Sequence, residues 1–149
     1  MTAMVPPYPT GRNVLAGKTV LITAAAGTGI GFATAKRCVE EGATVMISDI
    51  HERRLAEAAS RLAAIAGTRP PSRLCNVTRE ADVQALIDTA IAEMGRIDVL
   101  VNNAGLGGFA PLVDMTDEQW HAVLDVTLNG TFRMTRAALR HMVPRGSRI

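Results

Sequence analysis

A glycine-rich stretch follows the first β-branched run of the chain and precedes a helical pattern. It reads Ala24-Ala-Ala-Gly27-Thr-Gly29-Ile30-Gly31. Glycines permit a tight turn and close backbone approach, and the N-terminus of a following helix offers free N–H groups and a partial positive charge. The stretch therefore predicts a site for phosphate groups. The plain alternative is an ordinary turn, since connections between strands and helices often contain glycine.

A carboxylate, Asp49, lies 18 positions after Gly31, near the end of the second β-branched run. An acidic residue at about this spacing accepts hydrogen bonds from the ribose hydroxyls of a dinucleotide. It also repels a 2′-phosphate, so it favours NAD over NADP. The basic residues that follow, His51, Arg53 and Arg54, soften that preference. In isolation Asp49 would be read as a solvated acid in a turn.

Asparagines mark the ends of two further predicted strands. Asn76 ends the third, and Asn102-Asn103-Ala104-Gly105 follows the fourth. Ligands of open α/β sheets bind at the carboxyl ends of the strands. Asparagine amides both donate and accept hydrogen bonds, and Gly105 allows the backbone to approach a ribose. The alternative is again ordinary turns.

The elements that position these residues alternate between short apolar strands and amphipathic helices. Strands are predicted at residues 18–23, 43–50, 73–77 and 97–101, and helices at 30–41, 51–66, from an N-cap at Thr78 to Met94, and from a capping box at 116–119 to Pro144. The last helix is expected to be continuous, with one face formed by Trp120, Leu124, Thr127, Leu128, Thr131, Thr135, Ala138 and Met142. A second apolar set on it comprises Val123, Val126, Met134 and Ala137. Four βα units in series predict an α/β fold with a parallel sheet and right-handed connections.

Composition excludes several classes of protein. The chain has 149 residues, 48% of them hydrophobic, 20% charged and 3% aromatic, with a net charge of +2. Scattered basic residues and few aromatic ones argue against a nucleic-acid partner. No apolar run reaches the roughly 18 residues of a membrane span. Cys38 and Cys75 lie far apart and the histidines are dispersed, which predicts a reduced cytoplasmic protein without a metal site.

The order of these motifs, with Gly17-Lys18 before the first strand, closely resembles the short-chain dehydrogenase/reductase family over about residues 14–149. Pro6, Pro7 and Pro9 predict a flexible extension at 1–13. The resemblance implies a Rossmann-like doubly wound parallel sheet that is incomplete, with the first four βα units, in an NAD(P)-binding domain at 14–149. It also implies a small-molecule substrate and a homo-oligomeric full-length protein. By that similarity, the pyrophosphate binds the glycine-rich loop through Ala24, Gly27, Gly29, Ile30 and Gly31. Asp49 binds the adenosine ribose, and Asn76 and Val77 flank the adenine. The path to the nicotinamide is lined by Asn103, Ala104 and Gly105.

The sequence departs from the family pattern at three places. Ala24 stands at the first glycine of the loop, which carries one extra residue, and Gly27 is expected to supply the flexibility that Ala24 lacks. Thr127 stands where the family often has an asparagine that holds a proton-relay water; the alternative is a packed helix residue. The family's Ser and Tyr-x-x-x-Lys are absent, since the single tyrosine, Tyr8, precedes the fold.

These features resemble the N-terminal part of a family member, cut as a fifth strand begins at Arg148-Ile149. The intact protein would interconvert a secondary alcohol and a ketone, whereas residues 1–149 alone are expected to be inactive and to bind NAD weakly or not at all. The loop, residues 51–54 and residues 103–107 resemble reductases of CoA thioesters in steroid-ring breakdown. A 3-oxoacyl thioester reductase and a non-catalytic dinucleotide-binding redox sensor are the alternatives.

Overall fold

The computed structural model describes residues 6–107 and 110–146. Its strands form one parallel sheet in the order β3-β2-β1-β4. The strands are β1 (Thr19–Ile22), β2 (Thr44–Asp49), β3 (Ser72–Leu74) and β4 (Val99–Val101). β1 lies between β2 and β4, so the chain extends the sheet first to one side of β1 and then to the other, which confirms the predicted doubly wound α/β fold. The predicted strand start at Arg148-Ile149 lies outside the described residues.

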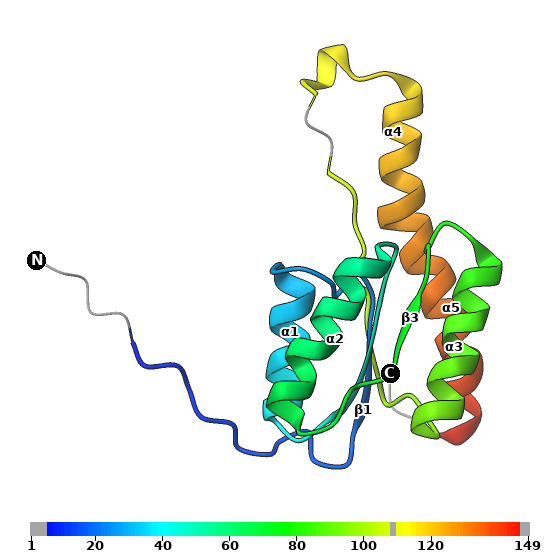
Figure 1. Cartoon of the computed structure of the whole chain (residues 1–149). Helices are drawn as coiled ribbons and strands as arrows, with labels where there is room; N and C mark the ends of the chain where they lie inside the picture. The colour runs from blue at the N-terminus through cyan, green and yellow to red at the C-terminus, as the bar shows by residue number, and fades with distance from the viewer. Residues whose placement is uncertain (1–5, 108–109, 147–149) are drawn as a thin grey trace, which may run out of the picture.

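Helices cover both faces of this sheet (Figure 1). α1 and α2 lie on one face, and α3 and α5 lie on the other, while α4 projects beyond the sheet. Their bounds are α1 (Ile30–Glu40), α2 (Glu52–Ala66), α3 (Glu80–Met94), α4 (Asp117–Leu124) and α5 (Gly130–Met142). None of the helices in the described segments is both long and apolar enough to cross a membrane.

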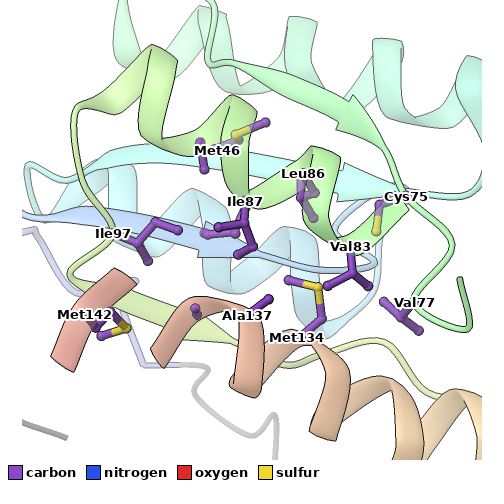
Figure 2. Close-up of a cluster of buried hydrophobic side chains, with 13 residues drawn as sticks. Met46, Cys75, Val77, Val83, Leu86, Ile87, Ile97, Met134, Ala137 and Met142 are labelled. Carbon is purple, nitrogen blue, oxygen red and sulfur yellow. The ribbon is translucent and has the colours of Figure 1, made fainter. Parts of the chain in front are cut away.

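The strands are apolar on both sides because both faces of the sheet are covered. In β1, Val20 and Ile22 pack into the cluster beneath α1 and α2. Leu21, between them in sequence, packs into the opposite cluster with residues of α3 and α5 such as Leu86 and Met134 (Figure 2). All three are fully buried, so the side-chain alternation of one strand supplies two cores.

The third helix begins later than its predicted N-cap, Thr78. The N-cap residue is Arg79, and α3 begins at Glu80. Thr78 instead donates to the Asn76 side-chain oxygen through its N–H at 3.0 Å and its hydroxyl at 2.8 Å. This local turn competes with the helix for the Thr78 groups, which explains the delayed start.

The predicted last helix is confirmed as one helical run, but a π-helical segment, η2 (Asp125–Asn129), lies within it between α4 and α5. Arg133 pairs with the Asp125 carboxylate at 2.8 Å across this turn. The buried face of α5 carries Met134 and Ala137, members of the second predicted set, whereas Leu128 is 61% exposed. Only Ala138 and Met142 of the predicted face are buried.

The segment before β1 makes specific contacts with the C-terminal end of α1. The Tyr8 hydroxyl donates to Glu40 at 2.6 Å, and Arg37 donates to the Pro9 carbonyl oxygen at 2.6 Å. Glu41 accepts from the backbone N–H of Arg12 at 2.8 Å. Residues 1–5 lie outside the described segments. The flexibility predicted for residues 1–13 stays a prediction, and the described part of this extension packs against α1.

Candidate functional site

The loops that follow the four strands meet at one edge of the sheet and enclose a cavity of about 110 Å³. Its lining includes six residues predicted to bind a dinucleotide: Ala24, Asp49, Asn76, Val77, Ala104 and Gly105. Ile50, Cys75 and Val126 complete it. Sequence reasoning missed these three, because apolar residues beside strand ends are indistinguishable from core residues in sequence.

The Asp49 carboxylate is oriented by two backbone groups. One oxygen accepts from the Ala26 N–H at 3.1 Å and the other accepts from the His51 N–H at 3.0 Å. Asp49 is 8% exposed and lines the cavity. Each carboxylate oxygen can accept more than one hydrogen bond. The group is therefore held in place with acceptor capacity left for the hydroxyls of a ribose.

The extra residue in the glycine-rich loop is accommodated at two positions. Gly27 has a φ of +90°, as expected of a residue that supplies flexibility. Ala24 also adopts a left-handed φ of +51°, which the sequence analysis did not foresee for a residue with a Cβ. Such a conformation costs an L-residue about 1–2 kcal/mol. Hydrogen bonds to the neighbouring peptides offset this cost, including one from Ala25 N–H to the Ser48 carbonyl at 2.9 Å.

Gly31 and Gly29 serve the loop in different ways. A Cβ added at Gly31 would lie 2.6 Å from the Ala24 carbonyl oxygen and would collide with the Asn103 amide. A Cβ added at Gly29 would meet no atom of the described chain within 4 Å. Gly29 is the N-cap of α1 and supplies no side-chain cap. The first turn of α1 therefore faces open space with free N–H groups, a geometry that fits a pyrophosphate.

Asn103 and Thr23 join the loop after β4 to the loop after β1. The Thr23 hydroxyl oxygen accepts from the backbone N–H of Asn103 and of Ala104, each at 3.0 Å. The Asn103 side chain donates to the Thr23 and Ala24 carbonyl oxygens at 3.1 and 2.9 Å. Asn103 thus acts on the site by holding its loops. Thr23 was missed as a site residue, although a threonine that ends a strand directly before a glycine-rich loop is a usable signal.

The Asn76-Val77 edge of the cavity is supported from α5. Asn76 uses its side-chain oxygen to accept from Thr78, which leaves its NH₂ group facing no described acceptor. Val77 lies so close to Gly130 that a Cβ added there would come within 2.7 Å of Val77 Cγ2. Arg133 donates to the Val77 carbonyl oxygen at 3.5 Å. Gly130 and Arg133 are supporting residues that no local sequence signal predicted.

The hydroxyl of Thr127 has two protein partners. It accepts from the Leu106 N–H at 3.2 Å and faces the Leu106 carbonyl oxygen at 3.4 Å. Thr127 lies in the π-turn η2. Its observed contacts therefore fasten the loop after β4 to the π-turn.

Two other candidate chemical groups do not act in this cavity. Burial raises the pKa of the Cys75 thiol to about 12, so the thiol stays neutral and forms part of the apolar wall. Tyr8 contacts Glu40 at the C-terminal end of α1, and this end lies at the opposite edge of the sheet. Within residues 6–107 and 110–146, no three His, Cys, Asp or Glu side chains form a group that could hold a metal ion.

A larger groove of about 630 Å³ lies along the exposed side of α5. Its lining combines three apolar residues with two threonines and two arginines: Leu128, Phe132, Leu139, Thr131, Thr135, Arg136 and Arg140. It contains none of the residues predicted to bind a cofactor. The smaller cavity, where a carboxylate and a glycine-rich loop converge at the strand ends, has the chemistry of a ligand site.

A parallel sheet with a glycine-rich loop after β1 and an acidic residue at the end of β2 defines a dinucleotide-binding α/β protein. The family model for short chain dehydrogenases matches residues 18–149. The chain therefore belongs to the short-chain dehydrogenase family, as its motifs indicated.

Curated relatives narrow the comparison. The chain is 60% identical over 131 residues to (5R,7aS)-5-hydroxy-7a-methyl-1-oxo-2,3,5,6,7,7a-hexahydro-1H-indene-carboxyl-CoA reductase of Mycobacterium tuberculosis, covering 88% of this chain and 50% of the relative. It is 40% identical to a 3-oxoacyl-acyl-carrier-protein reductase of Thermotoga maritima, covering 87% of this chain and 52% of that relative. The chain spans about half the length of the curated relatives it matches.

Solved structures agree with the fold. A short chain dehydrogenase from Mycobacterium smegmatis superposes with a TM-score of 0.89 at 54% identity, covering 93% of this chain and 58% of the other. Actinorhodin polyketide ketoreductase, solved with NADPH, superposes with a TM-score of 0.81 at 34% identity, covering 87% of this chain and 49% of the other.

Proposed function

We propose that residues 14–149 form the cofactor-binding part of an NAD(P)-dependent oxidoreductase that interconverts a secondary alcohol and a ketone. The observation that carries this proposal is the Asp49 carboxylate, which lines the cavity and accepts from Ala26 of the glycine-rich loop. A dinucleotide needs an anion site and a ribose acceptor side by side. When bound, the nicotinamide supplies or accepts the hydride.

In this proposal the chain binds and orients the cofactor. Free N–H groups of the first turn of α1, around Ile30, bind the pyrophosphate. Asp49 accepts from the adenosine ribose, while Asn76 and Val77 flank the adenine. Asn103 holds the loops in register, and the backbone of Ala104 and Gly105 lines the path toward the nicotinamide.

We propose NAD as the preferred cofactor, because Asp49 would repel a 2′-phosphate. Both oxygens of Asp49 are fixed by backbone N–H groups, so the carboxylate cannot turn away without breaking these bonds. NADP is the less favoured alternative. The NADPH in the polyketide ketoreductase structure belongs to that protein.

The proposed substrate is an acyl-CoA or another acyl thioester that carries a ketone or secondary alcohol. Support comes from the 60% identical relative, which is named as a reductase of a bicyclic carboxyl-CoA. A 3-oxoacyl thioester reductase is the neighbouring alternative, supported by the relative at 40% identity.

The test is an assay of the full-length protein that carries residues 1–149. With NADH and a ketone-bearing acyl-CoA, we expect loss of NADH absorbance and formation of the hydroxyacyl-CoA, with slower turnover on the free acid. Turnover of simple 3-oxoacyl thioesters at an equal or greater kcat/KM would favour the alternative substrate. Binding of NAD and NADH without turnover of any ketone would favour a redox sensor of the same fold.

We also propose a cytoplasmic homo-oligomer. The described cysteines, Cys38 and Cys75, are free thiols, as expected in a reducing compartment. Phe132 of α5 is 58% exposed and Leu128 of η2 is 61% exposed, and both would suit a subunit contact. Size-exclusion chromatography with light scattering of the full-length protein tests the oligomer.

A further inference from the structure

Arg61 of α2 reaches across to the glycine-rich loop and to α1. Its Nη1 group donates to the Gly27 carbonyl oxygen at 3.0 Å. Its guanidinium carbon lies 3.9 Å from the centroid of the Phe32 ring. Phe32 is buried in α1, so the ring provides a fixed surface for the guanidinium. Arg61 therefore connects α2, the loop and the first helix at one point.

The loop is held from two sides at adjacent residues. Asp49 accepts from the Ala26 N–H, and Arg61 donates to the carbonyl oxygen of the next residue, Gly27. Gly27 has a left-handed φ of +90°, and a Cβ added there would meet no described atom within 4 Å. These two polar contacts therefore hold consecutive residues of the turn, one from β2 and one from α2.

Holding the Gly27 carbonyl also orients the next N–H group. A trans peptide is planar, and its C=O and N–H groups point in opposite directions. Because the Gly27 carbonyl points to Arg61 on α2, the N–H of Thr28 points away from α2. No acceptor within the described part of the chain bonds to the Thr28 N–H. This donor precedes the free N–H groups of the first turn of α1.

We propose that Arg61 is a positioning residue for the pyrophosphate of the dinucleotide. It fixes the Gly27–Thr28 peptide so that the Thr28 N–H joins the N–H groups of α1, and it adds a positive charge beside the diphosphate. This inference rests on the proposed function, because it assumes that the cofactor occupies the loop. The loop carries one residue more than the family pattern, and a longer loop has more conformations that an added contact can exclude.

The alternative role of Arg61 is packing on Phe32 alone. An arginine stacked on an aromatic ring stabilises the contact between α1 and α2 without affecting a ligand. The two roles differ in what they predict for phosphate-bearing ligands. Loss of a positioning role lowers the affinity for ligands that carry the diphosphate, whereas loss of a packing role lowers the stability of the fold.

The experiment measures dissociation constants of NAD, ADP and adenosine for the full-length protein by calorimetry. Arg61→Met keeps the aliphatic stem and removes the charge and the donor. We expect this variant to raise the dissociation constants of NAD and ADP by about tenfold, and that of adenosine by less than about twofold. Arg61→Lys restores the charge and a donor, so its affinities for NAD and ADP should lie between those of the wild type and the methionine variant.

The matched control is Arg69→Met. Arg69 also donates to α2, to Ser60 at 2.9 Å and to the Ala56 carbonyl at 3.3 Å, but it has no contact with the loop. The Arg69→Met variant should leave the dissociation constants of NAD, ADP and adenosine unchanged. Equal weakening of adenosine and ADP by Arg61→Met would overturn the inference. So would a lower Tm with unchanged ADP affinity, or a lysine variant as weak as the methionine variant. A wild-type protein that binds neither NAD nor NADP would instead overturn the proposed function.

Discussion

The side-chain amide of Asn103 donates to the carbonyl oxygen of Ala24 at 2.9 Å, and so joins two loops that lie 79 residues apart in sequence. β1 and β4 are neighbours in the sheet, which brings the ends of these strands to the same edge. Ala24 has a left-handed φ of +51°. The Asn103 contact helps to hold this unfavourable conformation, on which the shape of the glycine-rich loop depends.

Replacing Asn103 by alanine should therefore affect both stability and binding. The substitution leaves the Thr23 and Ala24 carbonyl oxygens without their side-chain donor, which should lower the free energy of unfolding by about 1–3 kcal/mol. NAD affinity of the full-length protein should fall as the loop loosens. Denaturant unfolding and calorimetry measure the two effects. Asn102→Ala is the control, since Asn102 bonds only to the Thr135 hydroxyl at an exposed position. Equal losses for the two variants would contradict this role of Asn103.

Alanine at Gly31 should lower the stability of the fold, whereas alanine at Gly29 should lower the affinity for NAD and leave the stability unchanged. Gly31→Ala places a Cβ against the Ala24 carbonyl and the Asn103 amide, so the free energy of unfolding should fall by about 1–3 kcal/mol. Gly29→Ala meets no described atom and has a φ of −82°, so its Tm should stay near that of the wild type. The added methyl group nevertheless occupies the open N-terminus of α1 and should lower the affinity for NAD. Thermal unfolding with a binding titration separates the two, and normal NAD binding by Gly29→Ala would contradict the pyrophosphate assignment.

Removing the Asp49 carboxylate should change the choice of cofactor. In Asp49→Ala the ribose acceptor and the negative charge are both lost, so the NAD affinity should fall more than the NADP affinity. Competition binding on the full-length protein gives both dissociation constants. The variant also loses the contacts to the Ala26 and His51 N–H groups, so Tm is measured in parallel. Equal losses for NAD and NADP, at an unchanged Tm, would contradict the ribose assignment.

Acid should weaken the attachment of the N-terminal segment to α1. The N–H groups of Arg12 and Val14, together with the Arg37 guanidinium, hold the pKa of the Glu41 carboxyl below its usual range. A depressed carboxyl pKa contributes stability above the unfolded value of about 4.3, and this contribution disappears as the pH falls through the folded value. Tm should therefore drop on acidification below about pH 4.3. Glu41→Gln should reduce that drop, whereas Glu57→Gln, at an exposed pair with Arg53, should leave it unchanged.

The fold and the main parts of the site could be predicted because each depends on a local pattern. A β-branched run predicted β1, and glycines between that run and a helix predicted the turn that precedes α1, where we propose that the pyrophosphate binds. The π-turn at Asp125–Asn129 could not be predicted in this way. It is accompanied by an ion pair between Arg133 and Asp125, and no local pattern in the sequence indicates that these two side chains meet.

Sequence by itself determined the family, the parallel α/β architecture and the residues at the strand ends, since hydrophobic periodicity and glycine spacing are properties of short segments. Only the tertiary structure decided how these residues cooperate. Arg61 contacts Gly27 and Asn103 contacts Ala24 because helices and strands distant in sequence pack together. Such contacts depend on the positions of whole elements, and residue spacing along the chain does not predict them.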